Sequence, residues 1–511
     1  MENKAEGARL RRLTLVCLAA LLTLTAMVTA AGCDNQPTTN ASGGGSPGLD
    51  IGGKNKSSRE GAGDSDWKPY EPKPGEKTTL TVMYASDTSF YQNYGNLFLA
   101  SHPEVEFTIV DLSDTRGEGD MLANYEKVLA EQKPDVLLMN ENQYEALAAK
   151  GRLFELGVPM RRSKFDAEGM TPGVIDLLRE RGGGQLYGLS PAFESKGLYY
   201  NRAIFDAYGV PYPQPGMSWD DLLLLAARFP TKNEAGEPLT GLYQPTFTIS
   251  PFDLIVKIGG TKRLSLLDAE GTKLMLDGEA WKKVFSQVVE GYRSGAIYYP
   301  HAPLLDNGDG TTSISLGSNP FIDGKAAMAI DNLLMMRMMD FLAERKTGDG
   351  KRPAAFPWGT APMPVSPENP GVTPYFELVD IFGINRESAR IPLAWEFIQF
   401  IHGESFMRLK SKSTFELQSR SGFERDGKGR DLSDFYALGP DSVQRTLLVP
   451  DGFTRRFRDL SARVIEDVLA DRLTAEEGLA ELQKKGQEAL DAGYAAPTVH
   501  LERFALDEEL L

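Results

Sequence analysis

Three short apolar runs that alternate with helical segments constrain the fold of this chain most strongly. The predicted strands are 79–83, 105–110 and 135–139, and the predicted helices are 88–100, 118–131 and 142–150. Strands that are apolar on both faces and alternate with helices form a parallel sheet that helices cover on both sides. The sequence therefore predicts an α/β fold.

The carboxyl ends of these strands are the predicted binding edge, because ligands of open α/β sheets bind beyond the carboxyl ends of the strands. Tyr84 and Asp87 follow the first strand, and Asn140 and Glu141 follow the third. Each of the four is a candidate ligand contact. Each is equally well explained as a turn or helix-cap residue, so both interpretations stay open at this point.

Length, charge and cysteine content exclude several classes of protein. The 511 residues are enough for two or three domains. The net charge of −16 argues against nucleic acid, whose phosphates require an excess of basic residues. Both cysteines, Cys17 and Cys33, lie in the first 33 residues, and the four histidines lack the spacing of zinc ligands. We expect no disulfide framework, no metal and no cofactor.

The first 33 residues have the pattern of an export signal. Three arginines precede an uncharged apolar run from Leu13 to Ala31. The run leads into AAGC, which resembles the lipobox of bacterial lipoproteins, and this resemblance implies a lipid on Cys33. Ordinary signal cleavage and an uncleaved membrane anchor are the alternatives. All three place the rest of the chain outside the cytoplasm, and a lipid on Cys33 would hold it at the outer face of the cytoplasmic membrane.

Residues 34–76 form a predicted flexible tether. They contain almost no apolar residues and are rich in Gly, Ser and Pro. Such a segment cannot bury enough surface to offset its chain entropy. As a flexible coil it would span roughly 35–40 Å, which would hold a globular body near the membrane.

Several segments in order along the chain carry a family resemblance. Between residues 182 and 226 they read LYGLSPAF, LYYNRAIFDAYGVPYP and SWDDLL. PDVLLM precedes them, and NPFIDGKAAMAI, WGTAPMPVSP and FGINRESARIPLAWEFIQFI follow. Together they resemble the bacterial family 1 extracellular solute-binding proteins, the receptors of ABC importers and above all of sugar importers. The resemblance covers nearly all of residues 77–425.

This resemblance implies a two-lobed fold of the type II periplasmic-binding-protein kind, with a mainly parallel sheet in each lobe. The first lobe is expected to comprise residues 77–190 and 377–415, and the second 191–376 and 416–511. The chain is expected to cross between the lobes at three hinge segments, which are 191–194, 375–378 and 414–418. The lobes of such receptors close around a solute in the cleft.

A saccharide offers apolar C–H faces to aromatic rings, and hydroxyls to carboxylates and amides. The expected ligand contacts are therefore Tyr84, Asp87, Asn140, Glu141, Phe193, Glu194, Asp331, Asn332 and Trp358. Trp358 is the predicted stacking platform, while Tyr243, Gln244 and Phe376 are weaker candidates. Lys196 and Arg202 near the first crossing leave a charged saccharide open.

The resemblance implies a lipid-anchored receptor that captures a mono- or oligosaccharide and delivers it to an ABC permease. We expect a monomer that performs no chemistry. Two alternatives stay open: a receptor of the same fold for a non-sugar solute or for a sensor partner, and a surface enzyme that degrades polysaccharides. No GxSxG or HExxH motif supports the enzyme.

Overall fold

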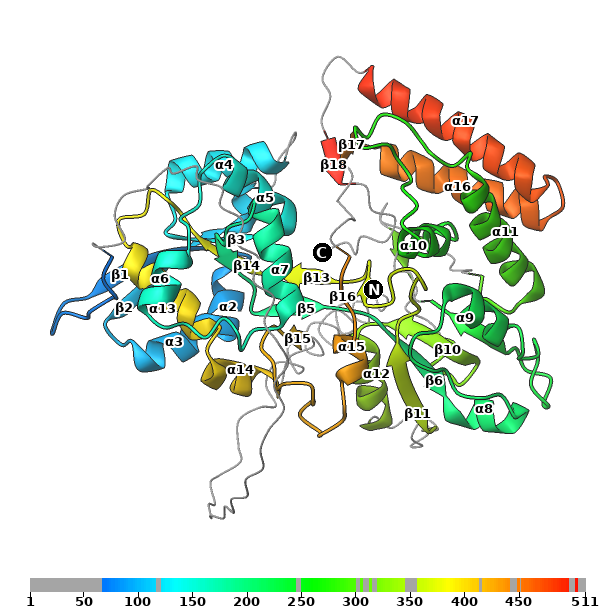
Figure 1. Ribbon diagram of the computed structural model, residues 1–511, viewed down its shortest axis with the longest axis horizontal. Coiled ribbons are helices and arrows are strands. Elements are labelled where there is room, and N and C mark those ends of the chain that lie inside the picture. Colours follow the sequence, from blue (N-terminus) through cyan, green and yellow to red (C-terminus); the bar gives the residue numbers. More distant parts are fainter. Residues whose placement is uncertain are drawn as a thin grey trace, which may run out of the picture. The chain divides into compact units, whose positions relative to one another are not determined.

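The alternating strands and helices at the start of the folded chain build a five-stranded sheet (Figure 1). The computed structural model describes residues 67–115, 121–244, 250–299, 304–306, 312–314, 319–344, 356–412, 416–441, 448–450, 452–495 and 501–503. The predicted signal peptide, Cys33 and the tether up to residue 66 lie outside the described residues.

The first sheet has the strand order β2-β1-β3-β14-β4. Its strands are β1 (Thr78–Tyr84), β2 (Val105–Asp111), β3 (Val136–Met139), β4 (Gly188–Leu189) and β14 (Ile381–Ile384). β1 runs parallel to β2 and β3, whereas β14 is antiparallel to both of its neighbours. β14 enters from a distant part of the chain, so its reversed direction was not evident from the local βαβ pattern.

Helices cover this sheet, and together they form what we call the first lobe. They are α2 (Asp87–Phe90), α3 (Asn96–Ser101), α4 (Met121–Gln132), α5 (Glu141–Ala149), α6 (Gly157–Arg162), α7 (Pro172–Arg181), α13 (Ile391–Ile401) and α14 (Glu404–Lys410). The single helix predicted over 88–100 is continuous but contains a π-helical turn, Tyr91–Gly95, between α2 and α3.

The second sheet has the strand order β11-β6-β10-β7. Its strands are β6 (Gly197–Asn201), β7 (Thr240–Tyr243), β10 (Ala326–Asp331) and β11 (Trp358–Pro362). β7 and β10 are parallel, and β6 is antiparallel to both β10 and β11. As in the first sheet, the reversed strand is one that the chain enters directly from a crossing segment.

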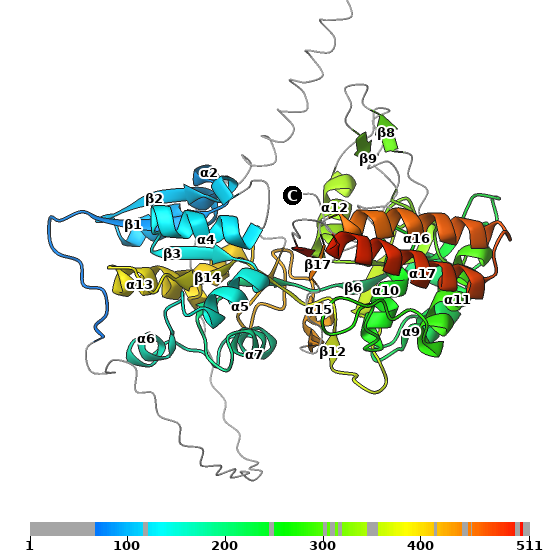
Figure 2. The same cartoon turned by 90° about the horizontal axis from the view of Figure 1, so that it is seen from above.

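The second sheet and its helices form the second lobe. The helices are α8 (Arg202–Tyr208), α9 (Trp219–Ala226), α10 (Asp253–Thr261), α11 (Glu279–Ser294), α12 (Leu333–Glu344), α15 (Ser433–Tyr436), α16 (Phe453–Leu469) and α17 (Ala475–Tyr494). The C-terminal helices α16 and α17 pack on each other and on α11 (Figure 2).

A third, three-stranded sheet contains the segments that connect the lobes. Its order is β13 (Glu377–Val379), β5 (Ala192–Glu194) and β15 (Leu417–Gln418), with antiparallel pairing throughout. β5 leads from β4 of the first sheet into β6 of the second, and β13 leads back into β14. The three segments predicted to cross between the lobes are therefore hydrogen-bonded neighbours (Figure 1).

Three two-stranded pairs complete the described strands. They are β8 (Leu304–Asp306) with β9 (Thr312–Ile314), β12 (Val372–Thr373) with β16 (Gly439–Pro440), and β17 (Leu448–Pro450) with β18 (Leu501–Arg503).

The hydrophobic core consists of two clusters. One extends from the first sheet through Phe193, Leu378 and Leu417 of the crossings to the α12 side of the second sheet. The other joins the opposite face of the second sheet to α9, α10, α11, α16 and α17. No described helix combines the length and the hydropathy that a membrane span requires.

Candidate ligand-binding site

The carboxyl edge of the second sheet brings three predicted contacts together. β10 ends at Asp331, and Asn332 follows it. The last residue of β5, Glu194, lies close by, and Asn332 Nδ2 donates a hydrogen bond to Glu194 Oε2 at 3.0 Å. Glu194, Asp331 and Asn332 are all half-buried. A crossing strand and the end of a sheet strand thus contribute polar groups to the same place.

Asn332 is held in one orientation by three further hydrogen bonds. Its backbone N–H donates to Asp331 Oδ1 at 2.8 Å, and its carbonyl accepts from the Tyr199 hydroxyl at 2.7 Å. Its side-chain oxygen accepts from the Leu334 N–H at 2.9 Å. The amide is therefore positioned by the start of α12 as well as by β10, so it can present fixed donors and acceptors to a solute.

The carboxyl edge of the first sheet is arranged differently, as Tyr84 illustrates. Tyr84 is only 4% exposed, and its ring packs on Phe382 and Phe90. Its hydroxyl donates to Asp380 Oδ2 at 3.3 Å, and the Tyr94 hydroxyl donates to the same oxygen at 3.1 Å. Burial and the Asp380 carboxylate raise the pKa of Tyr84. The position of Tyr84 fits core packing rather than contact with a solute.

Asp380 lies at the junction of β13 and β14 with a left-handed backbone, φ 57°. A non-glycine residue is uncommon in this conformation. Burial raises the pKa of its carboxyl above the ordinary value, although both tyrosine hydroxyls act in the opposite direction. A half-buried carboxylate in a strained position thus connects the second crossing to β1 and to the π-helical turn Tyr91–Gly95.

Asn140 and Glu141 serve the first lobe's own structure. Asn140 caps α5: its Oδ1 accepts from the Gln143 N–H at 2.9 Å, and Gln143 Oε1 accepts from the Asn140 N–H at 3.0 Å. Glu141 Oε1 accepts from the Leu378 N–H of β13 at 3.2 Å, and Arg181 Nε lies 3.7 Å from Glu141 Oε2. For Asn140 the helix-cap interpretation is confirmed, and Asn140 remains exposed.

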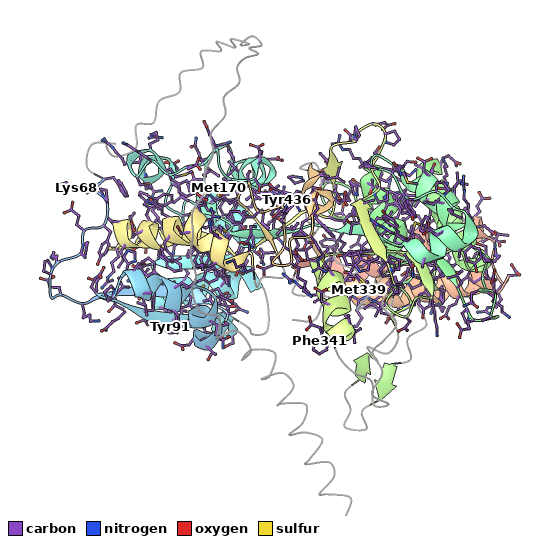
Figure 3. All side chains as sticks on the ribbon, turned by 90° about the horizontal axis from the view of Figure 1, so that it is seen from below. Lys68, Tyr91, Met170, Met339, Phe341 and Tyr436 are labelled. Carbon is purple, nitrogen blue, oxygen red and sulfur yellow. The ribbon has the colours of Figure 1, made fainter. Side chains whose placement is uncertain are left out.

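Asp87 and Phe193 have opposite environments. Asp87 is exposed at the first position of α2, which Ser86 caps. Phe193 is 0% exposed and stacks on Phe376, with ring centroids 4.5 Å apart. Tyr436 of α15, labelled in Figure 3, meets Phe193 edge-on and exchanges hydrogen bonds with the Gln418 backbone. Phe193 therefore packs in the core of the crossing sheet, which does not fit a direct ligand contact.

Strand register places Trp358 away from this site. Trp358 pairs with Asn201 across β11 and β6, whereas Asp331 pairs with Gly197 at the other end of β6. Four residues of extended strand, about 13 Å, separate the two pairs. Trp358 lies at the edge of the second sheet opposite to Asp331, because β11 begins where β10 begins. Arg202, which follows Asn201, lies at that same far edge and offers no support for a charged saccharide at Asp331.

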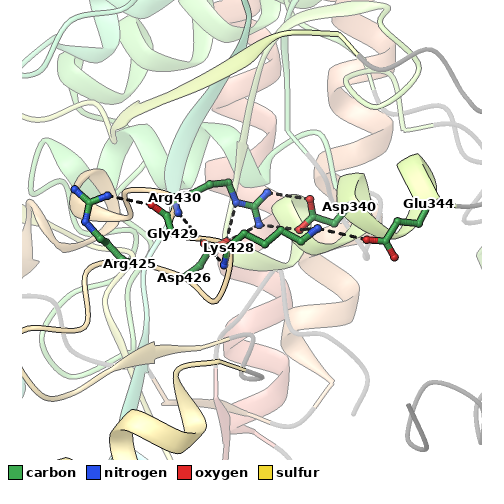
Figure 4. A network of polar contacts seen from close by, with 7 residues as sticks. All are labelled: Asp340, Glu344, Arg425, Asp426, Lys428, Gly429 and Arg430. Atoms are coloured by element: carbon green, nitrogen blue, oxygen red, sulfur yellow. Dashed lines mark hydrogen bonds and ion pairs between the residues drawn. The ribbon is translucent and has the colours of Figure 1, made fainter. Parts of the chain in front are cut away.

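The Trp358 ring is also engaged by the protein. The guanidinium carbon of Arg430 lies 5.7 Å from the ring centroid, and Arg430 binds Asp340 of α12 through two hydrogen bonds of 2.9 and 2.7 Å (Figure 4). Arg430 Nε also donates to Asp426 Oδ2 at 2.7 Å. This network connects the loop after the third crossing to α12 and β11. In it, the Trp358 ring packs against the Arg430 guanidinium, which is a structural role.

The end of β7 brings two of the weaker candidates to this edge. β7 runs parallel to β10, so Tyr243 and Gln244 reach the same edge as Asp331 and Asn332. Tyr298 joins them, with its ring 5.5 Å from that of Tyr243 at 82°. The short apolar run at 240–243 was the available signal for Tyr243 and Gln244. No sequence signal pointed to Tyr298.

Lys196 lies between β5 and β6 and is half-buried, with its ammonium 5.5 Å from the centroid of the Tyr375 ring. Within the part of the chain that the structure describes, no group of three His, Cys, Asp or Glu side chains could hold a metal ion. The groups available at the edge are carboxylates, amides, aromatic rings and the Lys196 ammonium, which together can bind the hydroxyls and C–H faces of a polar solute.

Comparison with known proteins gives one family and a set of similar folds. The family model described as bacterial extracellular solute-binding protein matches residues 84–405. None of the curated protein sequences is significantly similar to this chain.

Three solved structures illustrate the similarity of fold. An extracellular solute-binding protein family 1 member from Alicyclobacillus acidocaldarius has a TM-score of 0.57 at 14% identity, covering 82% of this chain and 100% of that one. A sugar transporter protein from Rhizobium etli in an open conformation has a TM-score of 0.54 at 18% identity, covering 81% of this chain and 99% of that one. An ABC substrate-binding protein from Listeria monocytogenes in complex with cycloalternan has a TM-score of 0.51 at 18% identity, covering 81% of this chain and 100% of that one. The predicted two-lobed α/β fold is confirmed by these similarities.

Proposed function

Because the chain belongs to the bacterial extracellular solute-binding protein family, we propose that it is a receptor for a mono- or oligosaccharide. The hydrogen bond between Asn332 and Glu194 carries this proposal. It joins a crossing strand to the carboxyl edge of the second sheet, so the bound solute would contact the protein where the lobes connect. The relatives of similar fold whose names mention sugars or cycloalternan support a saccharide.

The solute would be held between the carboxyl edges of the two sheets. Glu194, Asp331 and Asn332 would bind its hydroxyls from the second lobe and the crossing. Exposed Asp87 and Asn140 would bind from the first lobe. Carboxylates form strong charge-assisted hydrogen bonds with hydroxyl donors. A solute that contacts both edges binds the closed arrangement better than the open one, and this difference drives closure.

In this proposal each of the two sheets, with its helices, would move as one rigid lobe. Residues 77–190 and 377–415 would move as the first lobe, and 191–376 and 416–511 as the second. β14, α13 and α14 of the first group flank the first sheet, and α15–α17 of the second group pack with the second. Rotation would then occur about the sheet of β13, β5 and β15.

The receptor would act at the membrane without chemistry of its own. A lipid on Cys33 and the tether of residues 34–76 would hold it on the outer face of the cytoplasmic membrane. As a monomer, it would pass its solute unchanged to an ABC permease.

A thermal-shift screen of the full-length chain in detergent tests this function. The panel contains maltose, maltotetraose, cellotetraose and mannitol, with amino acids and a tripeptide as controls. A ligand that binds only the native state raises the melting temperature by mass action, equivalent to about 2.7 kcal/mol at 100 times Kd. We expect a saccharide to raise it, and we expect the saccharide to be recovered intact.

Two variants connect the shift to the site. Glu194→Gln and Asn332→Ala should reduce the shift, whereas Glu270→Gln, an exposed carboxylate of the second lobe, should leave it unchanged. A shift from the amino acids or the tripeptide with none from the saccharides would contradict the saccharide function. Conversion of the saccharide would contradict a receptor without chemistry.

A further inference from the structure

We propose that Tyr243 and Tyr298 form the stacking platform of this receptor, and that with Gln244 and Asp331 they select a neutral pyranose saccharide. This inference rests on the proposed function, because it assigns a solute class and a specific contact surface to the same site. It replaces Trp358 as the source of aromatic contact.

Strand pairing brings the two rings to the binding edge. Tyr243 pairs with Ala329 of the parallel strand β10, two residues before Asp331. A bridge between Leu242 and Ile297 and a hydrogen bond from the Tyr298 N–H to the Leu242 carbonyl, 2.8 Å, place Tyr298 beside Tyr243. Backbone pairing thus fixes both aromatic residues independently of any solute.

The rings are arranged as a corner. Their planes meet at 82°, their centroids are 5.5 Å apart, and both residues are half-buried. An edge-to-face pair is a favoured aromatic geometry, so it holds its shape without a ligand. A pyranose presents flat patches of C–H groups, and a rigid aromatic surface binds them with little loss of side-chain freedom.

Gln244 supplies an acceptor next to this corner. Its Nε2 donates to Asp253 Oδ2 at 2.8 Å, and Asp253 in turn lies 2.8 Å from the Lys257 ammonium. This chain of contacts orients the amide. Gln244 Oε1 is buried and has no hydrogen-bond partner among the described residues. Buried acceptors are nearly always paired, so this atom is suited to a hydroxyl of the solute.

Asp331 sets the preference for charge. Its carboxylate is close enough to Tyr243 to contribute to the raised pKa of that hydroxyl, after burial. The carboxylates of Asp331 and Glu194 outnumber the single ammonium of Lys196 at this edge, so together with the amide oxygen they favour hydroxyl donors and repel a carboxylate. The site should therefore bind a neutral oligosaccharide better than a uronic-acid oligomer.

Titration calorimetry on the full-length chain tests the platform with maltotetraose, cellotetraose and tetragalacturonate. We expect one of the neutral tetrasaccharides to bind at least tenfold more tightly than tetragalacturonate. Tyr243→Ala and Tyr298→Ala should each weaken that binding at least tenfold, and Gln244→Leu should weaken it severalfold. Tyr243→Leu removes the aromatic ring but keeps apolar volume, and it replaces Tyr243→Ala if the alanine variant does not fold.

Tyr208→Ala is the matched control, because Tyr208 is also half-buried but ends α8, which begins at the opposite edge of the sheet. Its affinity should equal that of the wild type. If the wild type binds a neutral tetrasaccharide and the tyrosine variants bind it equally well, the platform is overturned while the receptor function stands. Tighter binding of tetragalacturonate overturns the charge preference. If no member of the panel binds, the platform fails together with the saccharide function.

Discussion

The two sheets carry similar polar residues at their carboxyl edges but use them differently. In the first lobe, Tyr84 binds Asp380, Asn140 caps α5, and Glu141 binds the backbone of β13. In the second lobe, Asn332 reaches across to Glu194 on a crossing strand. The side chains at the first edge are thus bonded within their own lobe, whereas the second edge is bonded to a crossing strand.

The reason for this difference lies in the position of the crossings. β13 passes directly into β14, an inner strand of the first sheet, so residues at that edge hold the hinge in place. In the second sheet, β5 passes into the reversed strand β6. Glu194, the last residue of β5, therefore lies near the end of β10. The first lobe would thus supply a firm base, and the second would supply most of the recognition.

The largest expected difference between the lobes is their response to acid. His402 of the first lobe is 0% exposed, its Nδ1 lies 2.7 Å from the Ile398 carbonyl, and burial lowers its pKa to about 4. In the unfolded chain the pKa is about 6.5. The native state is fully stable above that value and loses up to about 3 kcal/mol as the pH falls to 4, because only the unfolded chain takes up the proton.

Denaturant unfolding from pH 7 to 4 measures this loss, and hydrogen exchange locates it in the first lobe. His402→Asn should flatten the pH dependence, while His102→Asn, on the partly exposed end of α3, should not. An unchanged slope in His402→Asn would show that other groups cause the acid sensitivity.

In the second lobe the expected weak point is the Arg430 network. Arg430→Met leaves Asp426, whose side chain is 4% exposed, and Asp340 without their main partner. Removing charge-assisted hydrogen bonds from partly buried groups should cost about 2 kcal/mol in the free energy of unfolding. Urea unfolding of the wild type and of Arg430→Met at pH 7 measures this loss of stability.

Arg425→Met is the control for this network, because Arg425 is exposed and its guanidinium donates only to the Gly429 carbonyl among the bonds of Figure 4. Its loss should be below about 0.5 kcal/mol. Burial alone would raise the pKa of Asp340, but hydrogen bonds from Arg430 and Lys428 lower it. The cost of Arg430→Met should therefore shrink as the pH falls and Asp340 becomes protonated.

The sequence predicted local elements well because their signals are local. The runs 79–83 and 105–110 became β1 and β2. The three crossing segments were also located, through the family resemblance. The lobe limits and the individual ligand contacts remain predictions.

What the sequence did not reveal depends on strand register. The sequence predicts Trp358 as the stacking platform, but Trp358 begins β11, and the antiparallel pairing of β11 with β6 carries it to the far edge. The same pairing logic brings Tyr243 and Tyr298 together from positions 55 residues apart. Neither relation can be derived from composition or periodicity, because both depend on which distant strands become neighbours.

A smaller change tests whether Tyr84 is structural. Tyr84→Phe removes one hydroxyl from Asp380 and should cost about 1 kcal/mol of unfolding free energy without changing saccharide affinity. Tyr94→Phe is the matched variant, since its hydroxyl binds the same Asp380 oxygen. Melting and titration calorimetry on the same samples separate the two effects. A tenfold loss of affinity confined to Tyr84→Phe would make it a ligand contact and remove the contrast between the lobes.

The smallest expected effect compares two helix caps, one in each lobe. Asn140 caps α5 and Ser218 caps α9, each within a capping box. Asn140→Ala and Ser218→Ala should each cost about 0.5–1 kcal/mol in chemical unfolding. Asn140→Ser retains the cap but lacks the amide, so it should restore stability. If it restores stability yet leaves saccharide affinity reduced, Asn140 both caps its helix and binds the solute. If it restores both, Asn140 contributes structure alone, and recognition from that lobe rests on Asp87.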